Sequence, residues 1–273
     1  MRIARFAIGD EVSYGVVDAE GAAEHGNGTG ATTRGLTVAQ MSGHPFGPAA
    51  AVALTGARYP VADVRLLAPV LPSKIVAIGR NYLEHAREFG NEPPAEPLIF
   101  LKPSTAVIGP GDAIVRPGRL SQRVDFEGEL AIVFGRLCRD VPPARVPEVI
   151  FGYTCANDVT ARDLQASDGQ WARAKGFDTF CPLGPWIETD LDVTDVRLTT
   201  AVNDEVKQDS RTSLLIHGIV TLVSYVTAVM TLLPGDVLLT GTPAGVGPLV
   251  AGDTVSVSIE GIGTLTNRVS DGD

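Results

Sequence analysis

The sequence predicts a fold that is mainly β with some α. Its 273 residues include 30 Gly and 19 Pro, and short runs of Val, Ile, Leu and Thr lie between them. Short runs of this kind bounded by Gly and Pro are typical of strands joined by turns. Hydrophobic residues make up 44% of the chain, which is enough for one large domain with a small additional one.

Charge and hydropathy narrow the range of partners. The net charge of −10 and the pI near 4.9 argue against binding to nucleic acid or anionic membranes. The first residues contain no sustained apolar segment, and no stretch reaches the roughly 18 uncharged apolar residues of a membrane span. We therefore expect a cytoplasmic protein. The odd number of widely spaced cysteines, Cys138, Cys155 and Cys181, indicates reduced core thiols.

The N-terminal region is expected to form a small α+β domain without a chemical motif. Alternating polar and apolar residues predict a hairpin over residues 1–20, with Gly9 in its turn. Residues 21–35 are rich in Gly and Thr and are expected to form a loop. A short helix is predicted over residues 37–43, in the segment TVAQMSG.

A domain boundary is expected near residue 70, where a Pro-containing connection runs through residues 64–74. It divides the chain into domains 1–70 and 71–273. In the second domain, a helical turn is expected from Asn81 to Gly90, and one long helix over 213–231. Strands are predicted over residues 74–79, 97–103, 124–135, 149–159, 184–189, 196–206, 236–243 and 253–269.

The segment DFEGELAIVFG places Asp125, Glu127 and Glu129 at alternate positions before an apolar run. Alternate residues of a strand share one face, so Glu127 and Glu129 would lie roughly 6.5 to 7 Å apart along it. Carboxylates that enter a core are costly unless they are compensated, and a divalent cation would compensate them. A solvated strand edge is the commoner explanation of an isolated Glu-x-Glu. We expect Asp125 to be an outer or solvated residue.

A second acidic segment, GYTCANDVTARDLQ, argues against the explanation that Glu127 and Glu129 form only a solvated strand edge. Asp158 follows an apolar strand, and helical spacing would place Arg162 and Gln165 on the same face. Arg162 either pairs with Asp158 as an ordinary helix ion pair or binds a substrate carboxylate. Asp163 points elsewhere and is expected to be solvated.

Glu127, Glu129 and Asp158 together make an oxygen-only ligand set. Without Cys or suitably spaced His, such a set favours Mg²⁺ or Mn²⁺, with Ca²⁺ a further candidate, over Zn²⁺. Three protein oxygens would leave about three positions of an octahedral ion for water or substrate. This is the arrangement of a catalytic site rather than of a closed structural one.

A candidate general base lies in GRNYLEHAREFGN. His85 and Glu88 are neighbours on the expected helical turn, and the Glu would fix the imidazole tautomer. The alternative is an ordinary solvated helix face. Because Gly79 and Gly90 flank the turn, we expect residues 81–90 to act as a lid.

These segments together resemble the fumarylacetoacetate hydrolase family over roughly residues 72 to 270. The shorter, bacterial-type members match better than the eponymous enzyme, which has another acidic ligand upstream. The resemblance implies a mixed β-roll or sandwich catalytic domain, a homodimer, and Mg²⁺ or Mn²⁺ bound by the three carboxylates. The segments that carry it are GRNYLEHARE, PLIFLKPSTAVIGPGD, VDFEGELAIVFG, GYTCANDVTARDLQ, RAKGFDTFCPLGPWI and LLPGDVLLTGTPAGVG.

The resemblance also implies roles for single residues. His85 and Glu88 would activate water, and Lys175 would act with them as a catalytic residue. The loop GTPAGVG lacks the Lys-Ser/Thr ending of a phosphate-binding loop, so we interpret it as a turn that places Thr242 at the pocket. Lys102 also lies in a matching segment, but Lys175 is the stronger candidate. The substrate is expected to lie near Arg80, Tyr82, Arg162, Gln165 and Thr242.

The implied chemistry is that of a 2-oxo acid whose enolate is stabilised by a divalent cation. We expect an enzyme that hydrolyses a carbon–carbon bond of acylpyruvates or decarboxylates oxaloacetate. The alternative enzyme is a 2-hydroxyhepta-2,4-diene-1,7-dioate isomerase or 5-carboxymethyl-2-oxo-hex-3-ene-1,7-dioate decarboxylase of aromatic catabolism. A non-enzymatic alternative is a Ca²⁺-stabilised binding protein in which His85 has no function.

Overall fold

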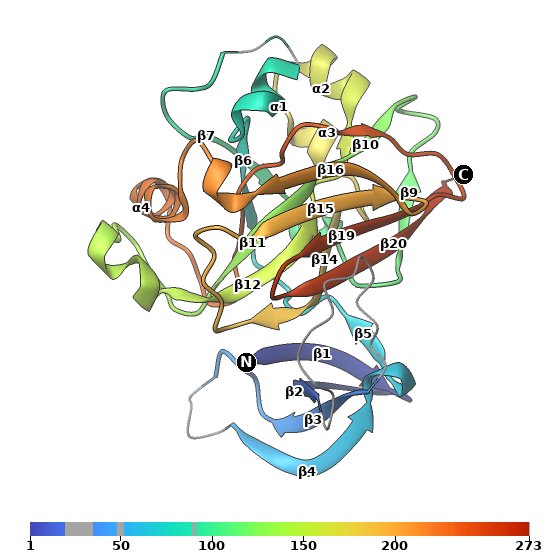
Figure 1. Cartoon of the computed structure of the whole chain (residues 1–273), viewed down its shortest axis with the longest axis vertical. Helices are drawn as coiled ribbons and strands as arrows, with labels where there is room; N and C mark the ends of the chain where they lie inside the picture. Colours follow the sequence, from blue (N-terminus) through green and yellow to red (C-terminus); the bar gives the residue numbers. More distant parts are fainter. Residues whose placement is uncertain (20–34, 48–51, 89, 91, 273) are drawn as a thin grey trace.

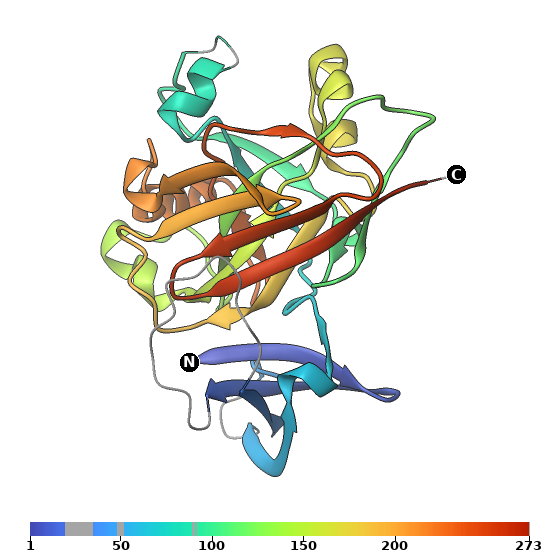
Figure 2. The ribbon, with the colours of Figure 1, turned by 45° about the vertical axis from the view of Figure 1, so that its right-hand side comes forward.

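The computed structural model describes residues 1–19, 35–47, 52–88, 90 and 92–272 (Figure 1). The loop expected at 21–35 lies outside these residues except for its last position. Three β-sheets form the body of the molecule. Figure 2 shows the N-terminal strands at one end of this body and short helices at the opposite end.

The largest sheet has 12 strands and joins the N-terminal strands to the rest of the chain. Its main path runs β4-β3-β2-β1-β14-β12-β11-β17-β6-β7, while β5 pairs with β1 and β8 with β14. The N-terminal hairpin is confirmed, with Gly9 at a φ of 56° in its turn. The strands are β1 Arg2–Ile8, β2 Glu11–Ala19, β3 Leu36–Ser42, β4 Ala53–Pro60, β5 Arg65–Leu67, β6 Ile75–Gly79, β7 Leu98–Lys102, β8 Val107–Ile108, β11 Gly128–Phe134, β12 Ile150–Asn157, β14 Cys181–Glu188 and β17 Val237–Leu239.

Two smaller sheets complete the β structure, in the orders β13-β10-β18 and β16-β15-β19-β20-β9. Their strands are β9 Ala113–Arg116, β10 Val124–Phe126, β13 Thr160–Ala161, β15 Arg197–Val202, β16 Glu205–Arg211, β18 Gly247–Pro248, β19 Thr254–Ile259 and β20 Gly263–Asp271.

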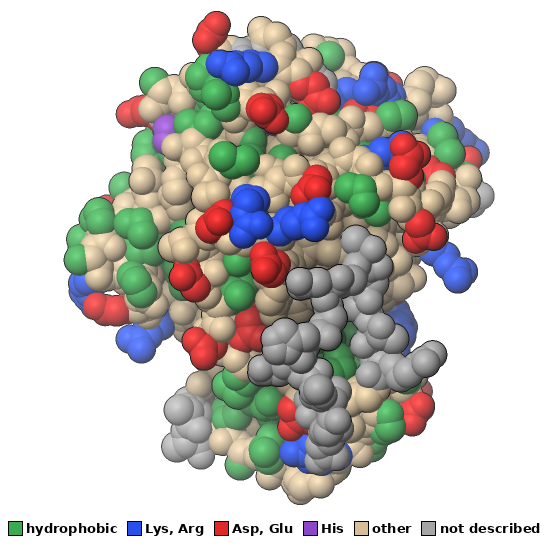
Figure 3. All heavy atoms as spheres, viewed as in Figure 1, with side chains coloured by type: hydrophobic (Ala, Val, Ile, Leu, Met, Phe, Trp, Pro, Cys, Tyr) green, Lys and Arg blue, Asp and Glu red, His purple; other side chains and the backbone are tan. Residues whose placement is uncertain are grey.

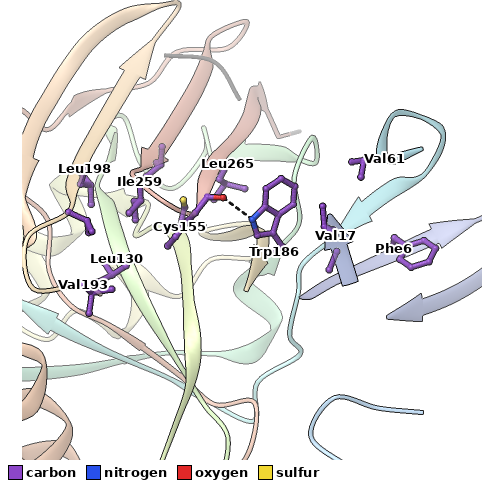
Figure 4. Close-up of a cluster of buried hydrophobic side chains, with 14 of the residues drawn as sticks. Phe6, Val17, Val61, Leu130, Cys155, Trp186, Val193, Leu198, Ile259 and Leu265 are labelled. Atoms are coloured by element: carbon purple, nitrogen blue, oxygen red, sulfur yellow. Dashed lines mark hydrogen bonds between the residues drawn. The ribbon is translucent and has the colours of Figure 1, made fainter. Parts of the chain in front are cut away.

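A hydrophobic core lies between the largest sheet and the five-stranded sheet (Figure 4). Leu130 and Cys155 come from the largest sheet, and Leu198 and Ile259 face them from the five-stranded one. Burying each such side chain stabilises the fold by about 1.5–3 kcal/mol. The same cluster continues through Trp186 into the N-terminal strands, so the two parts of the chain share one core.

The outer face of the five-stranded sheet carries exposed ion pairs. Arg197 pairs with Asp209, and Arg211 pairs with Asp195. In the view of Figure 3, acidic and basic side chains are interspersed over this part of the surface. Exposed pairs of this kind contribute about 0–1 kcal/mol each.

The helices are short. No helix among the described residues has the length and apolar character needed to cross a membrane. The helices are α1 Leu83–Glu88, α2 Arg162–Asp168, α3 Ala172–Lys175 and α4 Ile219–Val229, with 3₁₀ turns η2 Val61–Asp63, η3 Ser104–Ala106, η4 Pro143–Glu148 and η5 Thr212–Leu214.

Two helix predictions are corrected by the structure. The segment 37–43 forms most of strand β3 instead of a helix, because it pairs on one side with β2 and on the other with β4. The helix predicted over 213–231 begins only at Ile219, because Gly218 has an extended backbone at its N-cap. The short apolar segments alone did not distinguish buried strand from helix.

The strand predicted over 124–135 is broken at Glu127, between β10 and β11. A Cβ atom on Gly128 would lie 2.0 Å from Thr200 Oγ1, so this close approach of two sheets requires glycine. The Glu127 backbone N–H donates to Asn157 Oδ1, and its carbonyl accepts from the Asp158 N–H. Consequently Asp125 and Glu129 belong to different sheets, and the break holds Glu127 against the chain that carries Asp158.

Candidate active site

A cavity of about 240 Å³ lies under helices α1, α2 and α3 at the end of the largest sheet. Of the eleven residues predicted for the site, nine line this cavity. The exceptions are Glu88, which contacts His85 from outside the lining, and Tyr82, whose side chain is buried next to it. The structure thus brings together residues that are spread over more than 160 positions of the sequence.

Three carboxylates lie together at the base of the cavity. Glu127, Glu129 and Asp158 are 4%, 1% and 1% exposed. One oxygen from each group lies within 4.8 Å of the others. Burial of three like charges requires compensation, because an ionised carboxylate loses strong hydration when it leaves water.

Two buried lysines provide part of that compensation. Lys175 Nζ donates to Glu127 Oε2 at 2.8 Å and to Asp158 Oδ2 at 2.6 Å. Lys102 Nζ lies 2.7 Å from Asp158 Oδ1, and donates to the carbonyls of Val159 and Lys175. Lys102 therefore holds both Asp158 and the end of α3. Lys102 was expected to be a weaker candidate than Lys175, although its place at the end of an apolar strand was a usable signal.

The donor set fits a hard divalent cation. The Lys102 ion pair is not aligned as a hydrogen bond, so the buried Asp158 Oδ1 accepts none among the described residues. Glu129 accepts one hydrogen bond, from the Gly241 N–H at 2.6 Å. Carboxylate oxygens left with spare acceptor capacity are the ligands that Mg²⁺ and Mn²⁺ prefer. Glu127, Glu129 and Asp158 would hold such an ion.

The surroundings separate the pKa values of Glu127 and Glu129. Burial raises the pKa of Glu127, but the Lys175 ammonium and the Arg162 guanidinium outweigh burial and hold this pKa below its ordinary value. Burial raises the pKa of Glu129 well above its ordinary value, and the charges of Asp158 and Glu127 raise it further. Without a cation, Glu129 therefore keeps its proton more strongly than Glu127 does.

His85 has the features of a neutral base. It is 7% exposed, and its Nδ1 lies 3.4 Å from Glu88 Oε2. Burial lowers the pKa of His85, although the charges of Glu127 and Glu88 act in the opposite direction. A proton on Nδ1 that faces Glu88 leaves Nε2 as the basic nitrogen. The Glu88 carboxylate also accepts from the Gly245 N–H at 3.3 Å.

Arg162 pairs with Asp125 and Glu127 rather than with Asp158, while its contact with Gln165 agrees with the predicted shared face. Helix α2 begins at Arg162, so Asp158 is not on the helix and does not pair with it. The guanidinium donates to Asp125 at 2.9 Å, Glu127 at 2.7 Å and Gln165 at 2.7 Å. Asp125 is fully buried and not solvated; its carboxylate holds Arg162 against Glu127. The expected solvent exposure of Asp163 is confirmed.

The remaining predicted residues close the cavity in different ways. The Thr242 hydroxyl donates to the Gly128 carbonyl at 2.9 Å, which ties its loop to the broken strand. Tyr82 is 3% exposed, and burial raises its pKa, so it remains a neutral phenol. The guanidinium carbon of Arg80 lies over the ring of Trp171, 5.8 Å from the ring centroid, in a cation–π contact.

The start of helix α1 is fixed firmly to the body. The helical turn was expected to begin at Asn81, but the helix begins at Leu83. The Asn81 amide donates to the carbonyls of Thr240 and His217 and accepts from the His217 N–H. Gly79 packs against Trp171 and leaves no space for a hinge that rotates there. The lid over 81–90 stays a prediction, and any movement would have to begin after Tyr82.

Comparison with known proteins establishes the class. The model described as "Fumarylacetoacetate (FAA) hydrolase C-terminal" matches residues 74–270. A second model, "Rv2993c-like, N-terminal", matches residues 1–69. The chain therefore belongs to the fumarylacetoacetate hydrolase family, whose members are enzymes.

Three relatives show the range of the resemblance. Protein Rv2993c of Mycobacterium tuberculosis is 56% identical, with 98% of both chains covered. A 5-carboxymethyl-2-hydroxymuconate delta-isomerase from Mycobacterium smegmatis is 54% identical over 100% of both chains, with a TM-score of 0.87. A maleylpyruvate hydrolase from Sphingobium sp. SYK-6, solved with manganese(II) and pyruvate, is 32% identical over 100% of both chains, with a TM-score of 0.77.

Replacing Glu129 by Gln should have opposite effects on stability and on cation binding. An unfolded Glu has a pKa of about 4.3, and the folded value of Glu129 is higher. In the metal-free protein, Glu129 therefore contributes a loss of stability that grows as the pH rises above about 4.3. Glu129→Gln removes this loss, so the variant should be more stable than the parent at pH 7 without metal, and the difference should vanish near pH 4.

The same variant should bind Mn²⁺ at least about 100-fold more weakly, because even outer residues of metal sites typically contribute 10–100-fold. Urea unfolding with EDTA and calorimetric Mn²⁺ titration measure the two effects. Glu11→Gln, in the exposed first hairpin, is the control and should change neither. Unchanged Mn²⁺ affinity in Glu129→Gln would remove Glu129 from the ligand set.

Replacing Asp125 by Asn should loosen Arg162. The variant loses charged acceptors for a guanidinium whose side chain is 11% exposed, so we expect a destabilisation of about 1–3 kcal/mol. Arg123→Gln removes the other partner of the same carboxylate, on a side chain that is 53% exposed, and should cost less than about 1 kcal/mol. Equal effects of the two variants in urea unfolding would contradict a special role for the contact between Asp125 and Arg162.

Proposed function

We propose that this chain is a divalent-cation-dependent enzyme that hydrolyses the carbon–carbon bond of acylpyruvates or decarboxylates oxaloacetate. The observation that carries the proposal is that His85, paired with Glu88, lines the same cavity as three carboxylates and Lys175. The manganese and pyruvate in the related maleylpyruvate hydrolase support it, because pyruvate is a 2-oxo acid.

Positive charge at the base of the cavity would stabilise an enolate. A divalent cation held by Glu127, Glu129 and Asp158 would act as a Lewis acid toward the keto oxygen of a 2-oxo acid. Lys175 places an ammonium beside two of the same carboxylates. Because it is almost fully buried, its charge acts through a medium that screens it weakly. Lys175 thus favours the state in which the departing pyruvate carries negative charge.

His85 would supply the base that hydrolysis requires. Its Nε2 takes a proton from water, and the water oxygen forms a bond to the acyl carbon. The bond between that carbon and the pyruvate methylene then breaks, and its electron pair remains on pyruvate as the enolate. The proton held by His85 returns to the enolate carbon. Glu88 keeps the imidazole in one tautomer throughout.

Decarboxylation of oxaloacetate makes a smaller demand on His85. The bond to the carboxylate breaks without a nucleophile, and its electron pair again gives the pyruvate enolate. A proton is needed only afterwards, and solvent can supply it. Hydrolysis should therefore depend on His85 more strictly than decarboxylation does.

A second candidate is isomerisation or decarboxylation of unsaturated 2-oxo diacids, as in aromatic catabolism. The observation that favours it is the name of the Mycobacterium smegmatis relative, a delta-isomerase that is 54% identical over the whole chain. In this reaction His85 takes a proton from a carbon near the keto group and returns it to another carbon. No water enters the products.

A substrate panel tests the proposal. Acetylpyruvate, fumarylpyruvate, oxaloacetate and 2-hydroxyhepta-2,4-diene-1,7-dioate are assayed with Mg²⁺, with Mn²⁺ and with EDTA. We expect turnover of at least one acylpyruvate or of oxaloacetate, and its loss in EDTA. In His85→Ala, hydrolysis should fall by about 10²–10⁴-fold, the usual contribution of a general base, while decarboxylation falls less.

The panel also separates the alternatives. Turnover of the dioate alone would favour the isomerase and overturn the first candidate. Full activity in EDTA would contradict a role for a divalent cation. Binding of Ca²⁺ without turnover of any substrate of the panel would instead support the hypothesis of a Ca²⁺-stabilised binding protein. In that case His85→Ala should change neither stability nor Ca²⁺ binding.

A further inference from the structure

Arg80 is a cation in the cavity that has no acidic partner among the described residues. The other cationic side chains that line the cavity, Lys175 and Arg162, both bond directly to carboxylates. The side chain of Arg80 makes no ion pair or hydrogen bond with the described residues. Its guanidinium contacts the ring of Trp171. In a chain with 32 acidic and 22 basic residues, an arginine without a carboxylate partner in a cavity indicates that its partner is a ligand.

The guanidinium of Arg80 lies against Trp171, a side chain that is itself closely packed. A Cβ atom on Gly79 would lie 2.6 Å from the ring of Trp171, so this ring packs directly on the backbone beside Arg80. Phe100 also packs on Trp171 edge to face, with 5.2 Å between ring centroids. Stacking on a ring leaves the N–H groups at the edge of a guanidinium able to bind a carboxylate in bidentate fashion.

The backbone of Arg80 supports the same interpretation. Its φ of 57° lies in the left-handed region, which is uncommon for a residue with a long side chain. Such strain is unfavourable and is concentrated at ligand sites. The strained residue lies between strand β6 and helix α1, so it turns the chain from the sheet toward the helix that carries His85.

The charge balance of the cavity determines the kind of ligand. Arg80, Arg162 and Lys175 balance the three lining carboxylates. Behind the lining, Lys102 and Arg123 are balanced by Asp125 and Glu88. A bound divalent cation would leave the cavity with two excess positive charges. A dianion neutralises them, whereas a monoanion leaves one uncompensated, and such complementarity governs which ligand is selected.

We propose that Arg80 binds a second carboxylate of the substrate, so that this site selects 2-oxo dicarboxylates over 2-oxo monocarboxylates. The inference rests on the proposed function, because it assumes that the 2-oxo acid end lies at Glu127, Glu129 and Asp158. It distinguishes oxaloacetate and dicarboxylic acylpyruvates from acetylpyruvate. Arg80 is therefore a specificity-determining residue. Arg162 does not share this role, because its guanidinium is already bound to Asp125 and Glu127.

Binding measurements on the Mn²⁺-loaded protein test the proposal with two probes of equal chain length. 2-Oxoglutarate and 2-oxovalerate both have five carbons, and only the first carries a second carboxylate. By calorimetry, the parent protein should bind 2-oxoglutarate at least about tenfold more tightly. Arg80→Gln should weaken the binding of 2-oxoglutarate by about 10- to 100-fold, the usual contribution of a charged hydrogen bond. It should weaken the binding of 2-oxovalerate by less than about threefold.

Two further variants make the result specific. Arg80→Lys keeps the charge and should retain an intermediate preference for the diacid. Arg87→Gln removes an exposed arginine on α1 and should change neither affinity. Thermal unfolding of each variant, compared with the parent, establishes that it is folded.

The failure of Arg80 as a diacid site and the failure of the proposed function give different results. If Arg80→Gln weakens both probes equally, or weakens neither, the assignment of Arg80 is overturned while 2-oxo acid binding stands. If the parent protein binds neither probe in the presence of Mn²⁺, the proposed function fails and the Arg80 assignment fails with it. Selective loss of the diacid supports both.

Discussion

Burial of three carboxylates at one point is the constraint on which the rest of this structure depends. Glu127, Glu129 and Asp158 are almost completely shielded from water, and an uncompensated charge in such a place costs several kcal/mol. Cations from separate elements of the fold compensate these charges. Lys102 comes from β7, Lys175 from α3 and Arg162 from α2. Each of these elements thus brings one cation to the buried carboxylates.

The same constraint explains the break in the strand at Glu127. A continuous strand would have placed Asp125, Glu127 and Glu129 on one face with no means of separating their functions. Because the chain changes sheet at Gly128, Asp125 turns toward Arg162 while Glu129 turns toward the loop at Gly241. Three acids within five residues thereby perform two tasks: two of them face the cavity and one fixes a guanidinium.

The sequence could predict the parts of the site that local pattern determines. Glu127, Glu129 and Asp158 could be found because each adjoins an apolar strand, and His85 with Glu88 because three positions bring side chains together on a helix. The partner of Arg162 could not be predicted, because it depends on where α2 begins relative to β10. Asp125 was wrongly predicted to be solvated, and Lys102 was ranked below Lys175, for a related reason: each acts through a contact with an element distant in sequence.

In the fold, too, local pattern predicted some elements, while contacts with distant elements determined others. The strands around the site were predicted well, since Gly and Pro bound their apolar runs. The segment 37–43 was wrongly predicted as a helix, because seven residues with mixed propensity take the structure of their neighbours. There the hydrogen bonds to β2 and β4 decide the outcome. Local propensity yields to tertiary pairing in such short segments.

The central claim is that Glu127, Glu129 and Asp158 hold a divalent cation in the cavity that His85 lines. Anomalous X-ray diffraction at the manganese edge, from crystals grown with Mn²⁺, tests it most directly. The account predicts one strong peak for each chain, bounded by these three carboxylates. Peaks found only beside exposed acidic side chains, with the buried carboxylates bonded solely to Lys102, Lys175 and Arg162, would contradict it.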